Sequence, residues 1–252
     1  MATEPLAVLS DIHGNRWALE AVLSDLRRRG IRDMVNLGDS LYGPLDPAGT
    51  ARMLMELDMP TVRGNEDRIL LDDPSLHPDA LSLPYVRSVL EPGHRRWLNR
   101  LPFAVVVGDC YLCHGSPRAD DEYLLWEVSP GGCRRLPPDA VMARLAGPGP
   151  FIVLCGHDHL PACLDLPDGR CVVNPGSVGL PAYRDGRPFP HAMEAGSPHA
   201  RYAVIRRCRS GIEVEHVAVA YDWERAAATA EGNGRHDWAH ALRTGRAFRG
   251  ST

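Results

Sequence analysis

Short apolar runs recur along the first two thirds of the chain, and a polar block follows each of them. Runs of this length that end at glycine or at polar residues are typical of buried strands. Five such runs stand out, at 6–9, 34–37, 60–63, 111–113 and 151–154. We therefore expect five strands whose last residues lead directly into polar loops.

Apolar residues at helical spacing follow the first run. They predict a helix over 16–29, with Asn15 as a cap and Gly30 as its end. Further helices are expected at 48–58, near 139–145 and at 223–231. Alternating runs around turn residues predict hairpins at 103–113, 162–173 and 201–220, whereas 117–150 is expected to be rich in loops apart from its helix.

The length of 252 residues suits one domain with a sizeable core. The pattern by itself indicates an α/β protein. The segment 67–100 is polar and interrupted by proline, so we expect short helices that form a cap over the site. Residues 233–252 are expected to form a C-terminal tail.

Composition excludes several classes of protein. The chain has no Lys, which rules out Schiff-base catalysis and a Walker-type phosphate loop. The net charge of −4 argues against a strong general affinity for nucleic acid. No apolar run approaches the ~20 residues of a membrane span. No secretory signal is visible over 1–5, so we expect a cytoplasmic protein, with its seven cysteines reduced.

The polar blocks at the expected strand ends carry the chemistry. Strand ends are where the sites of α/β sheets are built. Imidazole and carboxylate together suit Mn, Fe, Zn, Ni or Co better than Ca or Mg alone. Seven ligands are too many for one ion, but two ions that share one carboxylate would use them all. The candidate metal ligands are Asp11, His13, Asp39, Asn65, His114, His157 and His159.

The order of these blocks resembles the calcineurin-like metallophosphoesterase superfamily, whose pattern is D-x-H, G-D, G-N-x-[DE], H and G-H-x-H. The resemblance is closest to the small prokaryotic single-domain members, which also carry the N-P-G-S found here at 174–177. It covers 6 to about 222. It implies a four-layer αββα sandwich of two mixed β-sheets flanked by helices. It also implies two divalent ions, with Mn²⁺ expected and Fe, Ni, Co or Zn as alternatives.

The resemblance further implies roles for individual residues. Asp39 would bridge the two ions and, with Asn65 and Glu66, form the catalytic set. One ion would take Asp11, His13, Asp39 and His159, and the other would take Asp39, Asn65, His114 and His157. A hydroxide held between the ions would attack phosphorus. Gly156 is expected to let the loop turn so that His157 and His159 serve different ions.

Substrate contacts are expected from Asn15, Arg16, Asn65 and Ser177. For two of the regions that contain these residues, a purely structural role is an alternative of equal weight. The stretch 14–16 could be only a helix start, and the turn at 174–177 could simply close a hairpin. The histidines outside the blocks are expected to be loop or core residues; they are His77, His94, His191, His199, His216, His236 and His240.

Glu66 stands where many members of the family have a histidine that is thought to protonate the leaving group. A carboxylate beside two cations should have a low pKa and donate a proton poorly. The expected substrates are therefore small phosphodiesters or activated phosphate esters. One alternative is a nuclease or nucleotide phosphatase with the same centre, which for polynucleotides would need a basic track. The other is a non-catalytic scaffold of the same fold.

Overall fold

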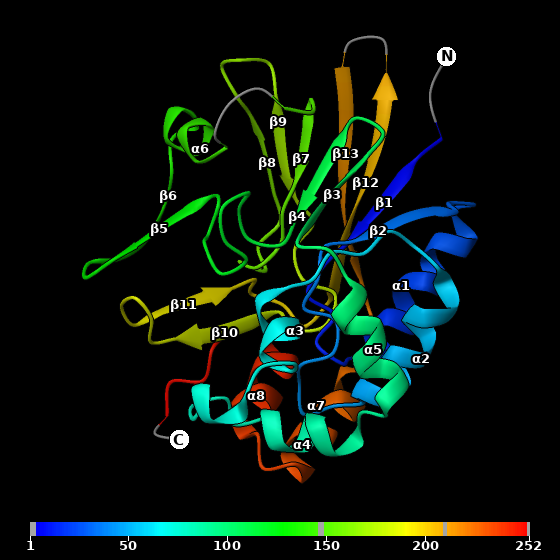
Figure 1. The fold of residues 1–252 in the computed structure, drawn as a ribbon, viewed down its shortest axis with the longest axis vertical. Helices are drawn as coiled ribbons and strands as arrows, with labels where there is room; N and C mark the ends of the chain where they lie inside the picture. Colours follow the sequence, from blue (N-terminus) through cyan, green and yellow to red (C-terminus); the bar gives the residue numbers. More distant parts are fainter. Residues whose placement is uncertain (1–3, 146–148, 209–210, 251–252) are drawn as a thin grey trace.

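The computed structural model describes residues 4–145, 149–208 and 211–250. Two mixed β-sheets pack face to face, and helices cover their outer faces (Figure 1). The expected four-layer αββα sandwich is therefore the observed architecture.

The first sheet has the strand order β13-β12-β1-β2, in which β1 runs parallel to β2 and antiparallel to β12. Its strands are β1 (Leu6–Leu9), β2 (Asp33–Asn36), β12 (Ala200–Cys208) and β13 (Gly211–Val219). The second sheet has the order β3-β4-β7-β9-β8. Its strands are β3 (Ala104–Val107), β4 (Cys110–Cys113), β7 (Ile152–Leu154), β8 (Ala162–Asp165) and β9 (Cys171–Asn174).

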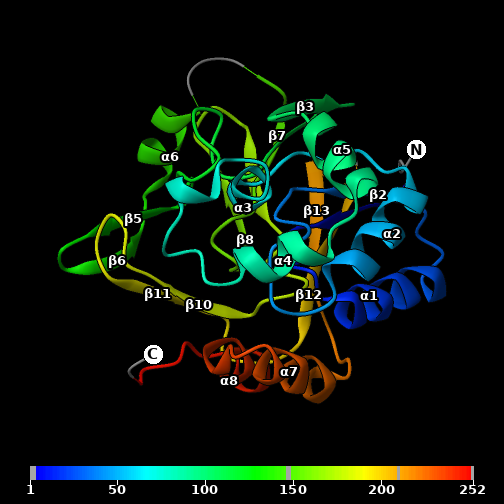
Figure 2. The ribbon, with the colours of Figure 1, turned by 60° about the horizontal axis from the view of Figure 1, so that its bottom comes forward.

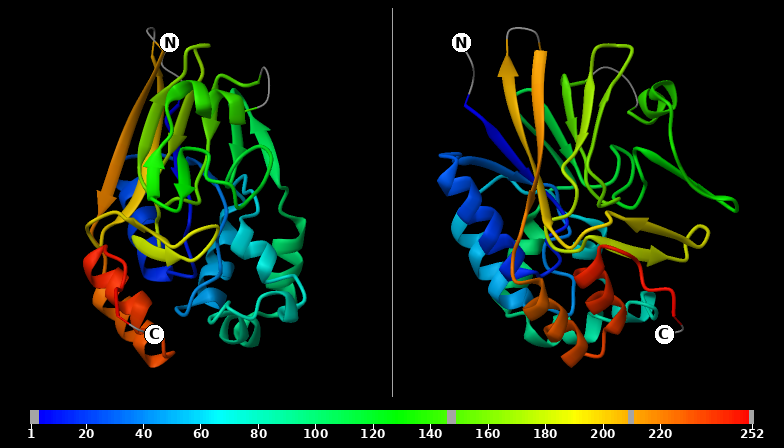
Figure 3. Two further views of the ribbon diagram at one scale, coloured as in Figure 1. Left: turned by 90° about the vertical axis from the view of Figure 1, so that its left-hand side faces the viewer. Right: turned by 180° about the vertical axis from the view of Figure 1, so that it is seen from behind.

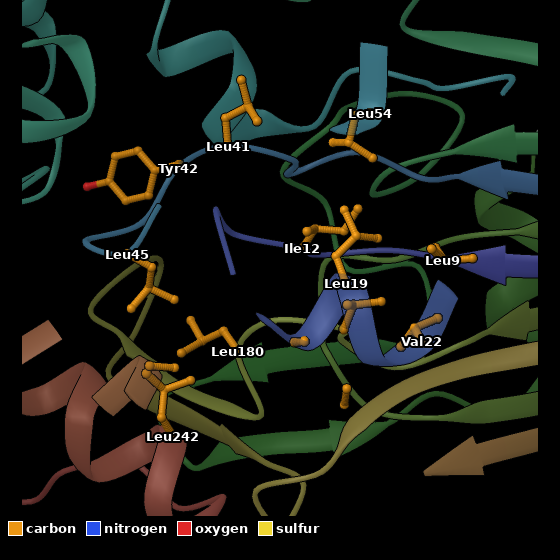
Figure 4. Close-up of a cluster of buried hydrophobic side chains, with 14 of the residues drawn as sticks. Leu9, Ile12, Leu19, Val22, Leu41, Tyr42, Leu45, Leu54, Leu180 and Leu242 are labelled. Atoms are coloured by element: carbon orange, nitrogen blue, oxygen red, sulfur yellow. The ribbon is translucent and has the colours of Figure 1, made fainter. Parts of the chain in front are cut away.

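Strand β1 shows how the sequence places the layers. Successive side chains of a strand point to opposite faces. Val8 therefore packs between the two sheets, whereas Leu9 points outward to Leu19 and Val22 of the first helix. Figure 4 shows this outer cluster. Because both faces of β1 are buried, its sequence is continuously apolar rather than alternating.

Helices α1 (Arg16–Arg28) and α2 (Pro47–Leu57) cover the first sheet, and α6 (Pro138–Arg144) covers the second. The Asn15 side chain caps α1 by accepting a hydrogen bond from the Ala18 amide at 3.2 Å. Helix α1 therefore begins directly after the loop that carries Asp11 and His13.

The segment 67–100 contains short helices, and Figure 1 places them below the carboxyl ends of the β1 and β2 strands. They are α3 (Asn65–Ile69), the 3₁₀ turn η1 (Pro74–Leu76), α4 (Leu83–Val89) and α5 (Pro92–Arg100). Helices α4 and α5 pack against α2.

The expectation of a tail over 233–252 is wrong for 236–244, because α7 (Trp223–Gly232) is followed by α8 (His236–Thr244), and residues 251–252 lie outside the described part of the chain. The two helices lie side by side (Figure 2). Trp238 and Leu242 of α8 are buried in the outer cluster of the first sheet. Two of the four buried apolar positions of α8 are alanines, which give a weak periodic signal, so packing rather than the local pattern defines this helix.

Three further features differ from the sequence-based expectation. The run 60–63 forms only an isolated bridge between Thr61 and Asn36. The stretch 117–150 contains a hairpin of β5 (Trp126–Ser129) and β6 (Gly132–Arg135). A second unexpected hairpin joins β10 (Ala182–Asp185) to β11 (His191–Glu194). Strands of four residues with mixed polarity carry too little alternation to be recognised.

The three expected hairpins are confirmed as the antiparallel pairs β3–β4, β8–β9 and β12–β13. The cysteines at 110, 113, 133, 155, 163 and 171 are free thiols. In the described part of the chain, no helix is both long and apolar enough to cross a membrane.

The packing of α8 predicts that Leu242→Ala destabilises the protein. Leu242 is fully buried, and truncation of such a leucine leaves a cavity that costs about 2–5 kcal/mol. Denaturant unfolding measures the loss. The control is His236→Ala, at an exposed position of the same helix, which should change stability by less than about 0.5 kcal/mol. Equal effects of the two substitutions would show that α8 does not pack on the core.

Candidate metal centre

The candidate ligands lie in loops at the carboxyl ends of the central strands. Asp11 and His13 follow β1, Asp39 follows β2, His114 follows β4, and His157 and His159 follow β7. Asn65 is the first residue of α3. The two sheets are packed so that these loops meet at one edge of the sandwich, and the structure brings all seven residues together.

Three histidines are oriented by the same device. The Nδ1–H of each ring donates to a backbone carbonyl, which leaves the Nε2 lone pair facing the centre of the site. The pairs are His13 with Tyr42 at 3.0 Å, His114 with Leu37 at 2.8 Å and His159 with Leu180 at 2.7 Å. The ring of His157 is reversed, because its Nε2 contacts the Asp121 carbonyl at 3.2 Å, so that Nδ1 is the free nitrogen.

The first group of ligand atoms contains Asp11, His13 and His159. The Nε2 atoms of His13 and His159 are 3.0 Å apart, and Asp11 Oδ1 lies 3.3 Å from His159 Nε2. Asp11 Oδ1 is buried and has no hydrogen-bond partner. Lone pairs this close require a proton or a cation between them. Two nitrogen ligands at ~2.1 Å from one ion and at right angles would lie about 3.0 Å apart, so the residues fit a metal ion.

The second group contains Asp39, His114 and His157. His114 Nε2 is 3.2 Å from Asp39 Oδ2 and 3.0 Å from Asn65 Oδ1, so the amide of Asn65 adds an oxygen to this group. The donor set of imidazole, carboxylate and amide oxygen suits the same borderline metals as the first group.

Asp39 lies between the two groups. It belongs to the second group and also to a third one with His13 and Glu66. Its Oδ1 accepts the Glu66 backbone N–H at 2.8 Å, which fixes the carboxylate and leaves Oδ2 toward His114. This is the position that a bridging carboxylate would need.

In the second group, the carboxylates act strongly on one of the two histidines. Burial lowers the pKa of His114, but Asp39 and Asp11 outweigh it and raise that pKa to about 10. Burial and the neighbouring His114 lower the pKa of His157 to about 4. In the metal-free protein a proton on His114 therefore balances the buried carboxylates.

The first group shows the same opposition of effects. Burial lowers the pKa of His13, but Glu66, Asp39 and Asp11 raise it to about 9. Burial also works against the Asp11 carboxylate, yet the surrounding histidines, His159 foremost, hold its pKa well below the usual range. Metal binding would displace the protons from these histidines, as is usual where imidazoles become ligands.

The backbone of the site is locally strained. Among the described residues that are not glycine, six have positive φ, and five of these are candidate ligands. Their φ values lie between 49° and 69°, in the left-handed region that side chains rarely adopt. The five are Asp11, His13, Asp39, His157 and His159.

The role expected for Gly156 needs correction. The histidines themselves make the turn, and the φ of Gly156 is not positive. A Cβ atom at this glycine would collide with Ser10 Oγ and come within 2.9 Å of Asp11 Oδ2. Gly156 is therefore required for close approach of the β7 loop to the β1 loop.

Three of the four expected substrate contacts are also not supported. The Asn15 amide is buried and fully used, since it donates to the Gly179 carbonyl and the Tyr221 hydroxyl and caps α1. The Ser177 hydroxyl is buried and donates to the Asp11 carbonyl at 2.8 Å. Arg16 pairs with acidic side chains on the surface. Of the expected contacts, only Asn65 lines the cavity that opens onto the candidate ligands.

Several supporting residues were missed by sequence reasoning. Asp67 is buried and accepts hydrogen bonds from the backbone of Gly64, Ser40 and Leu41, so it ties the Asp39 loop to α3. Its place in the G-N-x-[DE] block is the only signal for it. Burial, reinforced by Asp39, raises the pKa of Asp67 to about 7.

The ion pair between Arg68 and Asp120 had no sequence signal. Arg68 of α3 donates through Nε and Nη2 to the two carboxylate oxygens of Asp120, at 2.8 and 2.9 Å. The partners are 52 residues apart, so only the fold brings them together. They join the helix that begins with Asn65 to the loop whose Asp121 carbonyl contacts His157.

Two tyrosines complete the setting of the last ligand loop. The ring of Tyr123 stacks on His157 at 4.6 Å, and the ring of Tyr183 meets His159 edge-on at 4.6 Å. The Tyr183 hydroxyl donates to the His157 carbonyl at 3.0 Å. These contacts hold both imidazoles from the side that faces β10.

A cavity of about 750 Å³ opens onto the ligands. His13, Asp39, Asn65, His157 and His159 line it. Its walls come from Leu76–Leu81, from the β10 region and from the C-terminal segment, including Trp238 and Phe248. Figure 3 shows that segment beside β10 and β11, where the Ala247 amide donates to Glu194 at 2.9 Å.

Comparison with known proteins agrees with this geometry. Residues 5–193 match the calcineurin-like phosphoesterase superfamily domain. An uncharacterized protein of Methanocaldococcus jannaschii is 28% identical over an aligned length of 248 residues. The alignment covers 90% of this chain and 91% of that one. A metallophosphoesterase structure from Sphaerobacter thermophilus has a TM-score of 0.71 at 24% identity and covers 93% of this chain and 99% of that one. The chain therefore belongs to the calcineurin-like phosphoesterase superfamily, a family of metal-dependent hydrolases that act on phosphate esters.

Proposed function

We propose that the protein hydrolyses small phosphodiesters or activated phosphate esters with two divalent cations bound. The observation that carries this proposal is the presence of two groups of ligand atoms with Asp39 between them. Two bound dications would supply Lewis-acid activation of water and of the phosphoryl oxygens. The two ligand carboxylates, Asp11 and Asp39, are the only anions among the seven ligands, so the occupied centre keeps a net positive charge for an anionic ester.

Glu66 sets the expected preference among esters. Its carboxylate lines the cavity, is 27% exposed, and lies 3.1 Å from His13 Nδ1. Burial raises the pKa of Glu66 in the metal-free protein, whereas His13 opposes this rise and bound cations would lower that pKa further. An ionised Glu66 is a poor proton donor. Departure of the leaving group would then depend on the stability of its own anion.

The same carboxylate favours diesters over monoesters by charge. A phosphodiester brings one negative charge to the site, whereas a monoester dianion brings two. Repulsion by Glu66 at short range in a partly buried cavity would therefore act more strongly on the monoester.

For the metals, Mn²⁺ is the proposed physiological ion, with Fe, Ni, Co or Zn as the alternatives. The donor set of imidazole nitrogen and of carboxylate and amide oxygen contains no thiolate, and it is compatible with each of them. The choice among these ions rests on availability and geometry rather than on the residue types.

The nuclease alternative would need a basic track across the cavity mouth, and the arginines considered for it do not supply one. Arg28 and Arg29 pair with Asp25, Arg206 pairs with Glu215, and Arg134 and Arg207 also have acidic partners. None of the arginines at 27–29, 95–96, 134–135 and 206–207, all of which the structure describes, lines the cavity. Three other arginines, Arg184, Arg187 and Arg235, do line the cavity, and Arg235 pairs with Asp237. Arginines gathered inside one cavity suit a small anionic ester rather than a polynucleotide.

The first test is Asp39→Asn. The substitution removes the anion proposed to lie between the two cations, so at least one metal equivalent should be lost and activity should fall at least about 100-fold. Elemental analysis and hydrolysis of an aryl phosphodiester measure the two effects. Asp33→Asn, at the exposed start of β2, the strand that precedes Asp39, should leave both unchanged. Two bound ions with normal turnover in Asp39→Asn would remove the assignment.

The second test is Glu66→His, which introduces a proton donor. In the parent, kcat/KM should fall steeply as the pKa of the leaving group rises across a series of aryl esters. The histidine should flatten that dependence, with a gain of at most roughly 10²–10⁴-fold for the poorest leaving groups. Glu66→Gln is the matched control, because it removes the charge without adding a donor. It should improve monoesters relative to diesters and keep the steep slope. A shallow slope already present in the parent would show that another group donates the proton.

A further inference from the structure

The two most exposed large hydrophobic side chains in the described part of the chain lie on the rim of the metal-site cavity. Leu76 is 68% exposed and Leu81 is 63% exposed, and both line the same cavity as His13 and Asp39. Large exposed apolar side chains that gather at one place commonly mark a binding surface. The other exposed hydrophobic residues lie elsewhere, with Val106 on β3 the next most exposed at 54%.

The backbone beneath these leucines is anchored, which keeps them at the cavity mouth. The 3₁₀ turn η1 ends at Leu76, and Pro74 and Pro78 restrict the chain on either side of it. His77 Nε2 pairs with Asp72 Oδ2 at 3.0 Å, and Arg87 donates to the Asp72 carbonyl at 2.8 Å. The segment that carries the leucines is thus tied to the end of α3 and to α4.

The cavity has further apolar surface. Trp238, Ala241 and Phe248 from the C-terminal helix and segment line the cavity, together with Ile69 at the end of α3. A volume of about 750 Å³ is larger than a phosphate group needs and falls within the usual range for small-molecule sites. The metal centre and the two leucines therefore belong to one continuous site with a polar and an apolar part.

We propose that Leu76 and Leu81 bind an aromatic or similarly bulky apolar group of the ester. The substrate class is then a phosphate ester with a hydrophobic alcohol, which rests on the proposed function because the phosphoryl group must lie at the metal centre. The side chains of Leu76 and Leu81 would become buried only when an apolar group of the substrate is bound. An aryl alcohol is also a good leaving group, which agrees with the presence of Glu66 where a proton-donating histidine would otherwise stand.

The experiment compares phenylphosphonate with methylphosphonate, two ligands that are not hydrolysed, by calorimetry on the Mn²⁺-loaded protein. Phenylphosphonate should bind about tenfold more tightly, as expected when apolar surface equivalent to about two methylene groups leaves water. The double variant Leu76→Ser/Leu81→Ser should lose this difference and keep its affinity for methylphosphonate. Val106→Ser, which removes an exposed apolar side chain outside the cavity, should behave like the parent. Both leucines are exposed, so their replacement should not disturb folding.

Hydrolysis of bis(4-nitrophenyl) phosphate is measured in parallel, since both of its ester groups are aromatic. The double variant should lose about tenfold in kcat/KM, whereas inhibition by inorganic phosphate should stay unchanged. Hydrolysis without discrimination between the phosphonates would overturn the apolar subsite alone. Discrimination without metal-dependent hydrolysis would overturn the proposed function and leave the subsite. Discrimination that survives in the double variant would show that other residues carry it, which also overturns the proposal.

Discussion

The buried Oδ1 atom of Asp11 and the Nε2 atoms of His13 and His159 face one another so closely that a proton or a cation must lie between them. Buried polar atoms without partners are costly, and close lone pairs repel. A fold can hold such atoms together only if its other interactions are strong enough and if a proton or a metal cation lies between them. Most of what surrounds the centre can be understood as the means of holding these atoms in place.

Those means are visible at three levels. Ligands such as Asp11 and His13 sit in left-handed backbone, which lets loops end abruptly at the edge of the sandwich. Backbone carbonyls fix three imidazole rings from behind. Asp67, Ser177 and the Arg68–Asp120 pair then join the loops to one another. The two sheets supply the rigid layer from which all of these loops emerge.

The sequence was sufficient for the parts of the structure that depend on local pattern. Continuous apolar strands, the first helix and the ligand blocks are set by residues close together in the chain, and the family resemblance supplied their order. Asn15 and Ser177 were different, because they occur in recognisable motifs but use their polar groups internally. Whether such a side chain faces a substrate or the core depends on packing. The C-terminal part of the cavity wall also escaped prediction, since Trp238 and Phe248 approach the site from the far end of the chain.

That approach of the C-terminal segment has a practical consequence for handling the protein. Phe248 and Gly250 line the cavity, whereas β1 begins at the end of the sandwich away from the ligand loops (Figure 1). A polyhistidine tag fused on the carboxyl side of Gly250 would be attached close to the cavity wall and would bring extra imidazoles near it. A tag fused on the amino side of β1 would be attached at the end of that strand that faces away from the ligand loops. An affinity tag on the amino side therefore avoids adding foreign metal ligands when the number of bound ions is measured.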